Sequence, residues 1–151
     1  MMINVTPIKR FHVGNHGIIE EHSVVNNGVG DILVRDNSLI GLRNTIIEPI
    51  TIGNNAIIAQ NVAFSGLNRN YENINCSIQK KDVSTAPTKI KDECWIGTKA
   101  VITTGLTVGK HSIIAAESVV TKDIPNYCIA AGNPASIIKK QNGNTKRWEK
   151  I

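Results

Sequence analysis

Residues 90–125 read IKDECW IGTKAV ITTGLT VGKHSI IAAESV VTKDIP. All six hexads begin with Ile or Val, so an aliphatic residue returns at every sixth place without interruption. A period of six cannot keep to one face of a helix with 3.6 residues per turn, but it suits three short strands per coil. The first residue of each hexad then points inward, into a triangular prism.

The same period continues upstream of this stretch. Six hexads cover residues 34–69, and a shorter run of three begins at Val13, with three extra residues before Val34. Fifteen hexads at three per coil predict an all-β fold of about five coils, stacked at the ~4.8 Å spacing of neighbouring strands. Small residues at the fifth place, such as Ser38 and Ser112, indicate corners with little interior volume.

The composition narrows the class of protein. Hydrophobic residues make up 41% of the 151 residues but aromatic residues only 4%, so we expect an aliphatic core. No apolar stretch approaches the ~20 residues of a membrane-spanning helix, and the start lacks the apolar block of a secretory signal. Three cysteines without a CxxC pair indicate neither a disulfide framework nor a thiolate zinc site. These features predict a cytoplasmic protein without membrane insertion.

The basic residues concentrate near the C-terminus. The net charge is +5, and the cluster consists of Lys139, Lys140, Lys146, Arg147 and Lys150. A nucleic-acid surface would interleave such residues with aromatic stacking positions, and only Trp148 is nearby. We therefore expect a solvated basic tail and no nucleic-acid partner, with attraction of an anionic small ligand as the functional alternative.

The six-residue phase breaks at residues 70–89, NYENINCSIQKKDVSTAPTK, so this segment must leave the prism. Loops of this length without secondary structure are usually functional or disordered, and we favour a functional loop over a plain surface insertion. The predicted organisation is an N-terminal lead-in at residues 1–12, a β-helix at 13–125 with the extruded loop at 70–89, and a C-terminal cap and basic tail at 126–151.

The hexads and the block AAESVVTKDIPNYCIAAGNPASIIKK, residues 115–140, resemble the hexapeptide-repeat acyltransferases, especially the small sugar O-acetyltransferases of the maltose, thiogalactoside and colanic-acid type. The resemblance covers roughly residues 13–140. It implies a left-handed parallel β-helix that forms a homotrimer with active sites between the prisms. It also implies acetyl-coenzyme A (acetyl-CoA) as donor, and a sugar, nucleotide-sugar or polysaccharide precursor as acceptor, with direct transfer and no metal.

The resemblance also assigns roles to individual residues. It implies that Thr98, Ala116, Thr121 and Lys122 contact coenzyme A (CoA), and that Lys139 meets its phosphates. Two departures weaken the match, because Ser136 stands where arginine is common and Glu117 replaces a usual glycine. Two uses of Trp95 stay open: it lines the groove for the pantetheine arm, or it packs in an interface between subunits.

The general base of the family is missing from its expected place. Transfer needs a group that takes the proton of the acceptor, and the family's histidine aligns with Arg69 when Ser65, Gly66 and Tyr71 are matched. Arginine stays protonated in proteins and cannot be that base. Asn68 and Tyr71 are the expected acceptor-binding residues around it.

Three explanations for Arg69 stay open. Another group acts as base, Arg69 binds an anionic acceptor, or the protein is a catalytically impaired trimer that binds CoA or another ligand. His16, His22 and His111 share the fourth place of their hexads, where we expect exposed edges. A γ-type carbonic anhydrase would need three histidines converging on zinc, and this spacing puts them on the wrong faces, so no metal is expected.

Overall fold

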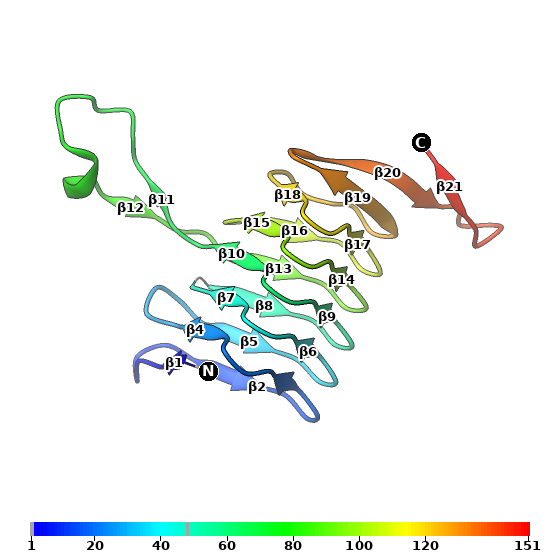
Figure 1. The fold of residues 1–151 in the computed structure, drawn as a ribbon, viewed down its shortest axis with the longest axis horizontal. Helices are drawn as coiled ribbons and strands as arrows, with labels where there is room; N and C mark the ends of the chain where they lie inside the picture. Colours follow the sequence, from blue (N-terminus) through cyan, green and yellow to red (C-terminus); the bar gives the residue numbers. More distant parts are fainter. Residues whose placement is uncertain (1, 48) are drawn as a thin grey trace.

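The computed structural model describes residues 2–47 and 49–151 and shows a triangular prism with an arm and a hairpin projecting from it (Figure 1). The chain visits three parallel sheets in turn. Sheet A contains β1 (Met2–Asn4), β4 (Val24–Asn26), β7 (Thr45–Ile46), β10 (Ala63–Ser65), β15 (Val101–Thr103) and β18 (Val119–Val120). Sheet B contains β2 (Phe11–Val13), β5 (Ile32–Val34), β8 (Ile50–Ile52), β13 (Thr88–Ile90) and β16 (Thr107–Val108).

Sheet C completes the prism and continues into the hairpin. Its parallel strands are β3 (Ile18–Ile19), β6 (Leu39–Ile40), β9 (Ile57–Ile58), β14 (Trp95–Ile96), β17 (Ile113–Ile114) and β19 (Cys128–Gly132). Antiparallel β20 (Ala135–Gln141) and β21 (Trp148–Lys150) follow. The arm contains β11 (Asn68–Arg69), the short 3-10 helix η1 (Ile78–Lys80) and β12 (Val83–Ser84).

The strand registers measure the length of each coil. Ile96 pairs with Ile114, eighteen positions later, as the hexad period predicts. Val13 pairs with Val34 across twenty-one positions, because three residues are added at the corner between β4 of sheet A and β5 of sheet B. The pairing of Ile58 with Ile96 spans thirty-eight positions, because the arm leaves between them.

The inward positions form the aliphatic core. The first residues of the hexads are fully or almost fully buried from Val25 upward: Val25, Val34, Ile40, Ile46, Ile52, Ile58, Phe64, Ile90, Ile96, Ile102, Val108, Ile114 and Val120. The small residues at the fifth place bond to the next coil, as where the Ser38 hydroxyl donates to the Gly53 carbonyl oxygen at 2.6 Å. The expected all-β, left-handed parallel β-helix is confirmed.

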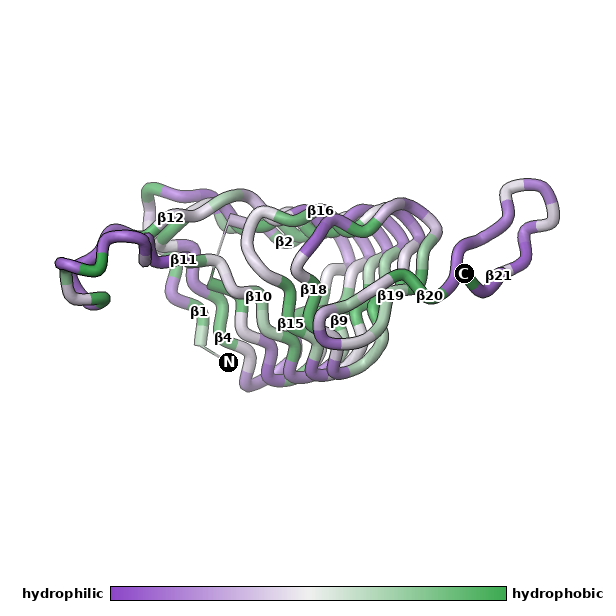
Figure 2. Tube along the Cα trace, turned by 90° about the horizontal axis from the view of Figure 1, so that it is seen from above, coloured by the Kyte–Doolittle hydropathy of each residue, from purple (hydrophilic) through white to green (hydrophobic). Residues whose placement is uncertain are grey.

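Two of the three corners place their fourth hexad residue in the left-handed region of backbone space. Non-glycine residues such as Arg43 (φ 57°) and His111 (φ 56°) occupy these places, and they recur coil after coil. Polar residues stack at the same corners in Figure 2. The glycines at the second place have a different purpose: a Cβ on Gly97 would lie 2.6 Å from the backbone nitrogen of Ala116 in the next coil.

The arm begins and ends earlier than residues 70–89. Asn68 and Arg69 already pair with Val83 and Ser84 in the arm, whereas Thr88 and Lys89 belong to β13 and pair with β8. Counting hexads missed these limits because the corner between sheets A and B has no fixed length, so the sixth-place rule does not mark where the chain leaves the prism. The excursion therefore lies between Ser65 and Thr88.

Among the described residues, paired strands extend into both segments that flank the predicted prism, the lead-in at 1–12 and the cap and tail at 126–151. β1 and β2 extend sheets A and B, and the buried Asn27 side chain donates to the Lys9 carbonyl oxygen at 2.8 Å. At the other end, β19 continues sheet C and β20 and β21 form a paired hairpin. The hexad pattern does not encode the backbone pairing of these strands. Within the described residues, no helix has the length and apolarity needed to cross a membrane.

Candidate functional site

Arg69 is tied into the arm. One guanidinium nitrogen, Nη1, donates to the carbonyl oxygens of Gln79 at 3.4 Å and Lys81 at 3.3 Å. The Lys81 ammonium donates to the Tyr71 carbonyl oxygen at 2.9 Å, so the two cations cross-link opposite sides of the arm. The local sequence thus uses Arg69 to close the excursion, a structural use that alignment with the family's histidine did not reveal.

The base of the arm borders a hollow on the outer face of sheet A. This cavity of about 260 Å³ is lined by Thr45, Ile47, Ala63, Phe64, Ser65, Gly66 and Leu67. Ser65 and Gly66, which begin the matched motif, lie in it. Asn68, Arg69 and Tyr71 do not line it; they are exposed on the arm, with Tyr71 72% exposed.

A larger groove lies on the outer face of sheet C. Its volume is about 480 Å³, and its lining consists of Ala59, Gln60, Trp95, Gly97, Thr98, Ile113, Ile114, Ala115 and Ala116. The floor is low because glycine and alanine stand beside the larger Trp95 and Ile113. The structure therefore brings together Thr98 and Ala116, two of the residues expected to contact CoA.

The polar groups of this groove are few and local. The Thr98 hydroxyl donates to the Gln60 side-chain oxygen at 3.0 Å, which fixes both side chains at the groove's edge. Glu117 is exposed at the next corner, 3.8 Å from the Lys99 ammonium. The carboxylate that replaces the usual glycine therefore has a neighbouring cation and a place outside the groove lining.

The other three expected CoA contacts lie elsewhere on the chain. Thr121 and Lys122 follow β18 at the corner between sheets A and B, while Lys139 is on β20 of the hairpin. None of the three lines the sheet C groove. Within one chain the five residues do not form a single site, so a site that uses all of them needs a second copy.

Lys150, a member of the basic cluster in the sequence, has a specific partner in the structure. Lys139 pairs directly with Lys150 across the antiparallel β20–β21 ladder, and both side chains are exposed. Like charges directly opposite one another destabilise a strand pair unless an anion lies between them. Lys140, by contrast, pairs with Glu149. Only the register of the hairpin, which sequence spacing left undefined, reveals this pair of ammonium groups.

An apolar column runs up the outside of sheet C. Its members are the sixth hexad residues in successive coils, Ile18, Leu39, Ile57, Trp95 and Ile113, followed by Ile129, which pairs with Ile113 beyond the last hexad. Ile18, Ile57 and Trp95 are 54%, 47% and 52% exposed. A contiguous apolar strip of this kind marks an interaction surface rather than a solvated face.

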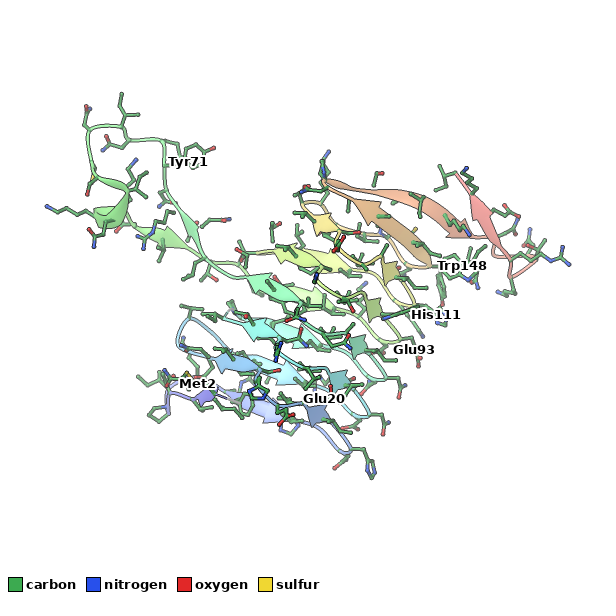
Figure 3. The ribbon with its side chains drawn as sticks, viewed as in Figure 1. Met2, Glu20, Tyr71, Glu93, His111 and Trp148 are labelled. Carbon is green, nitrogen blue, oxygen red and sulfur yellow. The ribbon has the colours of Figure 1, made fainter. Side chains whose placement is uncertain are left out.

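The histidines are exposed, three of them at corners, as their hexad places predict. His111 stacks on Tyr127 of the next coil, with ring centroids 5.8 Å apart. Figure 3 shows His111 at the corner between sheets B and C, on the other side of the prism from Tyr71 and the arm. Within the described residues, no three His, Cys, Asp or Glu side chains gather closely enough to hold a metal ion.

The two buried thiols are structural groups rather than nucleophiles. The Cys94 thiol donates to the Gly109 carbonyl oxygen at 3.0 Å, in the same way as the serines at fifth places. Burial raises the pKa of Cys94 and of Cys128, so the unreactive protonated thiol is favoured.

Comparisons with known proteins agree with this geometry. Residues 87–122 match the family described as bacterial transferase hexapeptide (six repeats), and residues 34–63 match the hexapeptide repeat of succinyl-transferase. Galactoside O-acetyltransferase of Escherichia coli K12 is 32% identical over 90% of this chain and 66% of its own length. The putative lipopolysaccharide biosynthesis O-acetyl transferase WbbJ of the same organism is 30% identical over 82% of this chain and 67% of its own length.

Solved structures share the fold. The N-acyltransferase AntD of Bacillus cereus, in complex with dTDP-4-amino-4,6-dideoxyglucose and CoA, superposes with a TM-score of 0.79 at 18% identity, over 95% of this chain and 80% of that one. The chain spans only about two thirds of the curated relatives described above. The identity to WbbJ, the matched repeats and the registered coils together show that this chain belongs to the hexapeptide-repeat acyltransferases.

Proposed function

We propose that the protein transfers an acetyl group from acetyl-CoA to a sugar, a nucleotide-sugar or a polysaccharide precursor. The observation that supports this proposal most directly is the sheet C groove, in which Thr98 and Ala116 lie beside Trp95 along a floor of glycine and alanine. A long, narrow chain such as the pantetheine arm fits an apolar groove of this kind with a few polar groups at its edge. The names of the two E. coli relatives, both O-acetyltransferases, support the reaction class.

The proposed chemistry is direct transfer. The acceptor oxygen or nitrogen forms a bond to the acyl carbon, the carbon–sulfur bond of the thioester breaks, and CoA leaves as the thiol. The proton of the acceptor passes to a base, which contributes about 10²–10⁴-fold to such reactions. Arg69 is not that base, because its guanidinium stays charged and is held by the arm.

The proposal includes a homotrimer. The apolar column on sheet C needs a partner surface, and the arm exposes further apolar side chains, including Ile74 at 89% and Ile78 at 55%. Sheet B exposes basic side chains such as Lys89 and Lys91. A chain that uses one face to bind a different face of the next copy forms a ring when the rotation between copies closes, and in the proposed trimer this ring brings Lys122 or His111 of one copy near the groove of another.

Arg69 supports a second candidate, a trimer that binds CoA or a related ligand without turnover. In that case the groove keeps its shape, while the place of the base has become part of the arm's own structure. This candidate predicts binding without transfer to any acceptor.

Separate measurements of binding and turnover distinguish the two candidates. CoA binding is measured by calorimetry, and release of free thiol from acetyl-CoA is followed with panels of sugars and nucleotide-sugars. Binding together with acceptor-dependent thiol release supports the transferase, and binding with no release across the panel supports the non-catalytic trimer. Ala116→Phe fills the groove and should abolish binding; absence of binding in the unmodified protein rules out both.

A further inference from the structure

The outer face of sheet B carries a second groove, which differs in character from the groove on sheet C. Its floor is β8, where the outward residues Thr51 and Gly53 are small. β5 and β13 on either side carry long basic side chains, Arg35 following β5 and Lys89 and Lys91 on and after β13. The groove exists because the outward side chains of one strand are short between two strands whose side chains are long.

The cations of this groove are free to bind an anion. The cavity has a volume of about 310 Å³ and is lined by Arg35, Thr51, Gly53, Asn54, Lys89, Ile90, Lys91, Asp92 and Lys110. Within the described part of the chain, Arg35, Lys89, Lys91 and Lys110 form no salt bridge and no side-chain hydrogen bond. All four side chains are exposed at the rim.

The one carboxylate in the lining is already occupied. Asp92 Oδ1 accepts hydrogen bonds from the Asn54 backbone nitrogen at 2.8 Å and from its side-chain nitrogen at 3.4 Å. The glycine in the floor is required there, because a Cβ on Gly53 would lie 2.5 Å from that same Asp92 oxygen. Asp92 therefore shapes the floor through its bonds to Asn54, and the lining carries four cations against this one carboxylate.

The groove continues past Thr51 into a neighbouring hollow, whose lining also includes Leu33, Pro49, Ile50 and Pro87. Arg10 and Asp31 in this lining form a salt bridge, with the Arg10 Nε donating to Asp31 Oδ2 at 2.8 Å, and Lys9 adds one further cation. Among the residues described, the combined groove therefore carries four unpaired cations at the end near Lys91 and is more apolar, with one unpaired lysine, at the end near Pro87.

We propose that the sheet B groove is a binding site for a small phosphorylated molecule, whose phosphoryl group lies among Arg35, Lys89, Lys91 and Lys110 and whose less polar body lies along Thr51 toward Pro49 and Pro87. Arginine can bind a phosphoryl group through two parallel hydrogen bonds, and lysines add point charges around it. Like charges brought together around one cavity repel one another, and a dianion removes this repulsion.

This site is distinct from the proposed acyl-transfer groove. The two are on different sheets and share no lining residue. Within one chain, a ligand on sheet B therefore occupies a surface apart from the acyl-transfer groove, and its binding can be measured without turnover of acetyl-CoA.

Calorimetry with inorganic pyrophosphate and with a nucleoside diphosphate tests the site at fixed ionic strength. We expect both probes to bind, the nucleoside diphosphate more tightly because its body occupies the apolar end. Arg35→Gln and Lys91→Gln should each weaken binding about tenfold, since each removes a charged hydrogen bond. Arg43→Gln is the matched control, an exposed arginine at another corner, and should leave the affinity unchanged.

The same titrations can also contradict the proposed binding site. Equal weakening by Arg43→Gln, or no weakening by either groove variant, means that the probes respond to net charge alone. If pyrophosphate competes with CoA, and Lys91→Gln abolishes that competition, then the cations of this groove bind CoA instead. Thermal melting of each variant establishes that lost binding is not lost folding, and CoA binding by Lys91→Gln separates failure of this site from failure of the proposed transferase.

Discussion

The guanidinium of Arg69 lies 3.3 Å from the carbonyl oxygen of Lys81, and the ammonium of Lys81 lies 2.9 Å from the carbonyl oxygen of Tyr71. Each cation thus satisfies a backbone carbonyl on the opposite side of the arm. Arg69, which the sequence alignment predicts to stand at the place of the family's base, is therefore part of the arm's closure, so its replacement should have structural consequences.

Arg69→Ala should loosen the arm without unfolding the prism. The variant loses two hydrogen bonds from an exposed charged donor, each worth about 1 kcal/mol or less in water, and the prism core does not include the arm. Hydrogen exchange should accelerate at residues 68–84, while the melting temperature changes little. Unchanged exchange in this segment would show that the guanidinium contacts do not hold the arm.

Arg69→His separates the structural role from the chemical one. Imidazole is too short to reach the two carbonyl oxygens, so we expect faster exchange in the arm and no gain in acetyl transfer. A gain of orders of magnitude would instead show that Arg69 simply stands in for a lost base, with the rest of the site intact.

His111 is the imidazole we expect to act as base across a subunit interface. It lies two residues before Ile113 of the sheet C groove, at a corner on the other side of the prism from this chain's own arm (Figure 3). His111→Asn should lower turnover about 100-fold or more and leave CoA affinity unchanged. Asparagine suits the positive φ of this place, since Asn37 and Asn55 occupy it in other coils.

The control for this substitution is His16→Asn, which has the same φ of 56° and the same corner, but lies in the first coils. It should have wild-type turnover. Equal turnover in His111→Asn and the wild-type protein would exclude His111 as base.

Lys150→Gln should move stability and affinity in opposite directions. Without ligand it removes the like-charge pair with Lys139 and should stabilise the hairpin by a few tenths of a kcal/mol. It should also weaken CoA binding several-fold if the two ammonium groups hold a phosphate. Lys140→Gln breaks the opposite-charge pair with Glu149, so it should neither stabilise the hairpin nor weaken CoA binding. If Lys140→Gln alone lowers the affinity for CoA, the Lys139–Lys150 pair is not the phosphate site.

The hexads predicted the prism because inward residues such as Ile96 and Ile114 must be aliphatic at a fixed spacing, and burial imposes that requirement in every coil. The assignment of Thr98 and Ala116 to a CoA site came from the family resemblance, and the structure places both in the sheet C groove. The hexad spacing could not predict structural features that depend on hydrogen bonds between segments outside the repeat. The contacts of Arg69, the register of Lys139 with Lys150, and the strand at Thr88 all belong to this class.

Ile57→Lys tests whether sheet C is an interface. The side chain is 47% exposed in the middle of the apolar column, so a charge there should abolish a trimer but spare the folded prism. Light scattering gives the mass in solution. Leu33→Lys is the matched control, a partly exposed outward aliphatic on sheet B, and should leave the mass unchanged. A trimer that survives Ile57→Lys but not Leu33→Lys would place the interface on sheet B.

Arg43 provides a test of the corner geometry that gives the coils their shape. Its φ of 57° costs an ordinary side chain about 1–2 kcal/mol, and no described residue bonds to its guanidinium. Arg43→Gly relieves that strain but raises the conformational entropy of the unfolded chain, so we expect the free energy of unfolding to rise by no more than about 1 kcal/mol.

Arg43→Val adds a branched Cβ at positive φ and should lower the free energy of unfolding by about 1–2 kcal/mol. Urea titrations at one protein concentration measure both, because an oligomer's stability depends on concentration. If valine is tolerated as well as glycine, the left-handed backbone at this corner is not a constraint on the sequence.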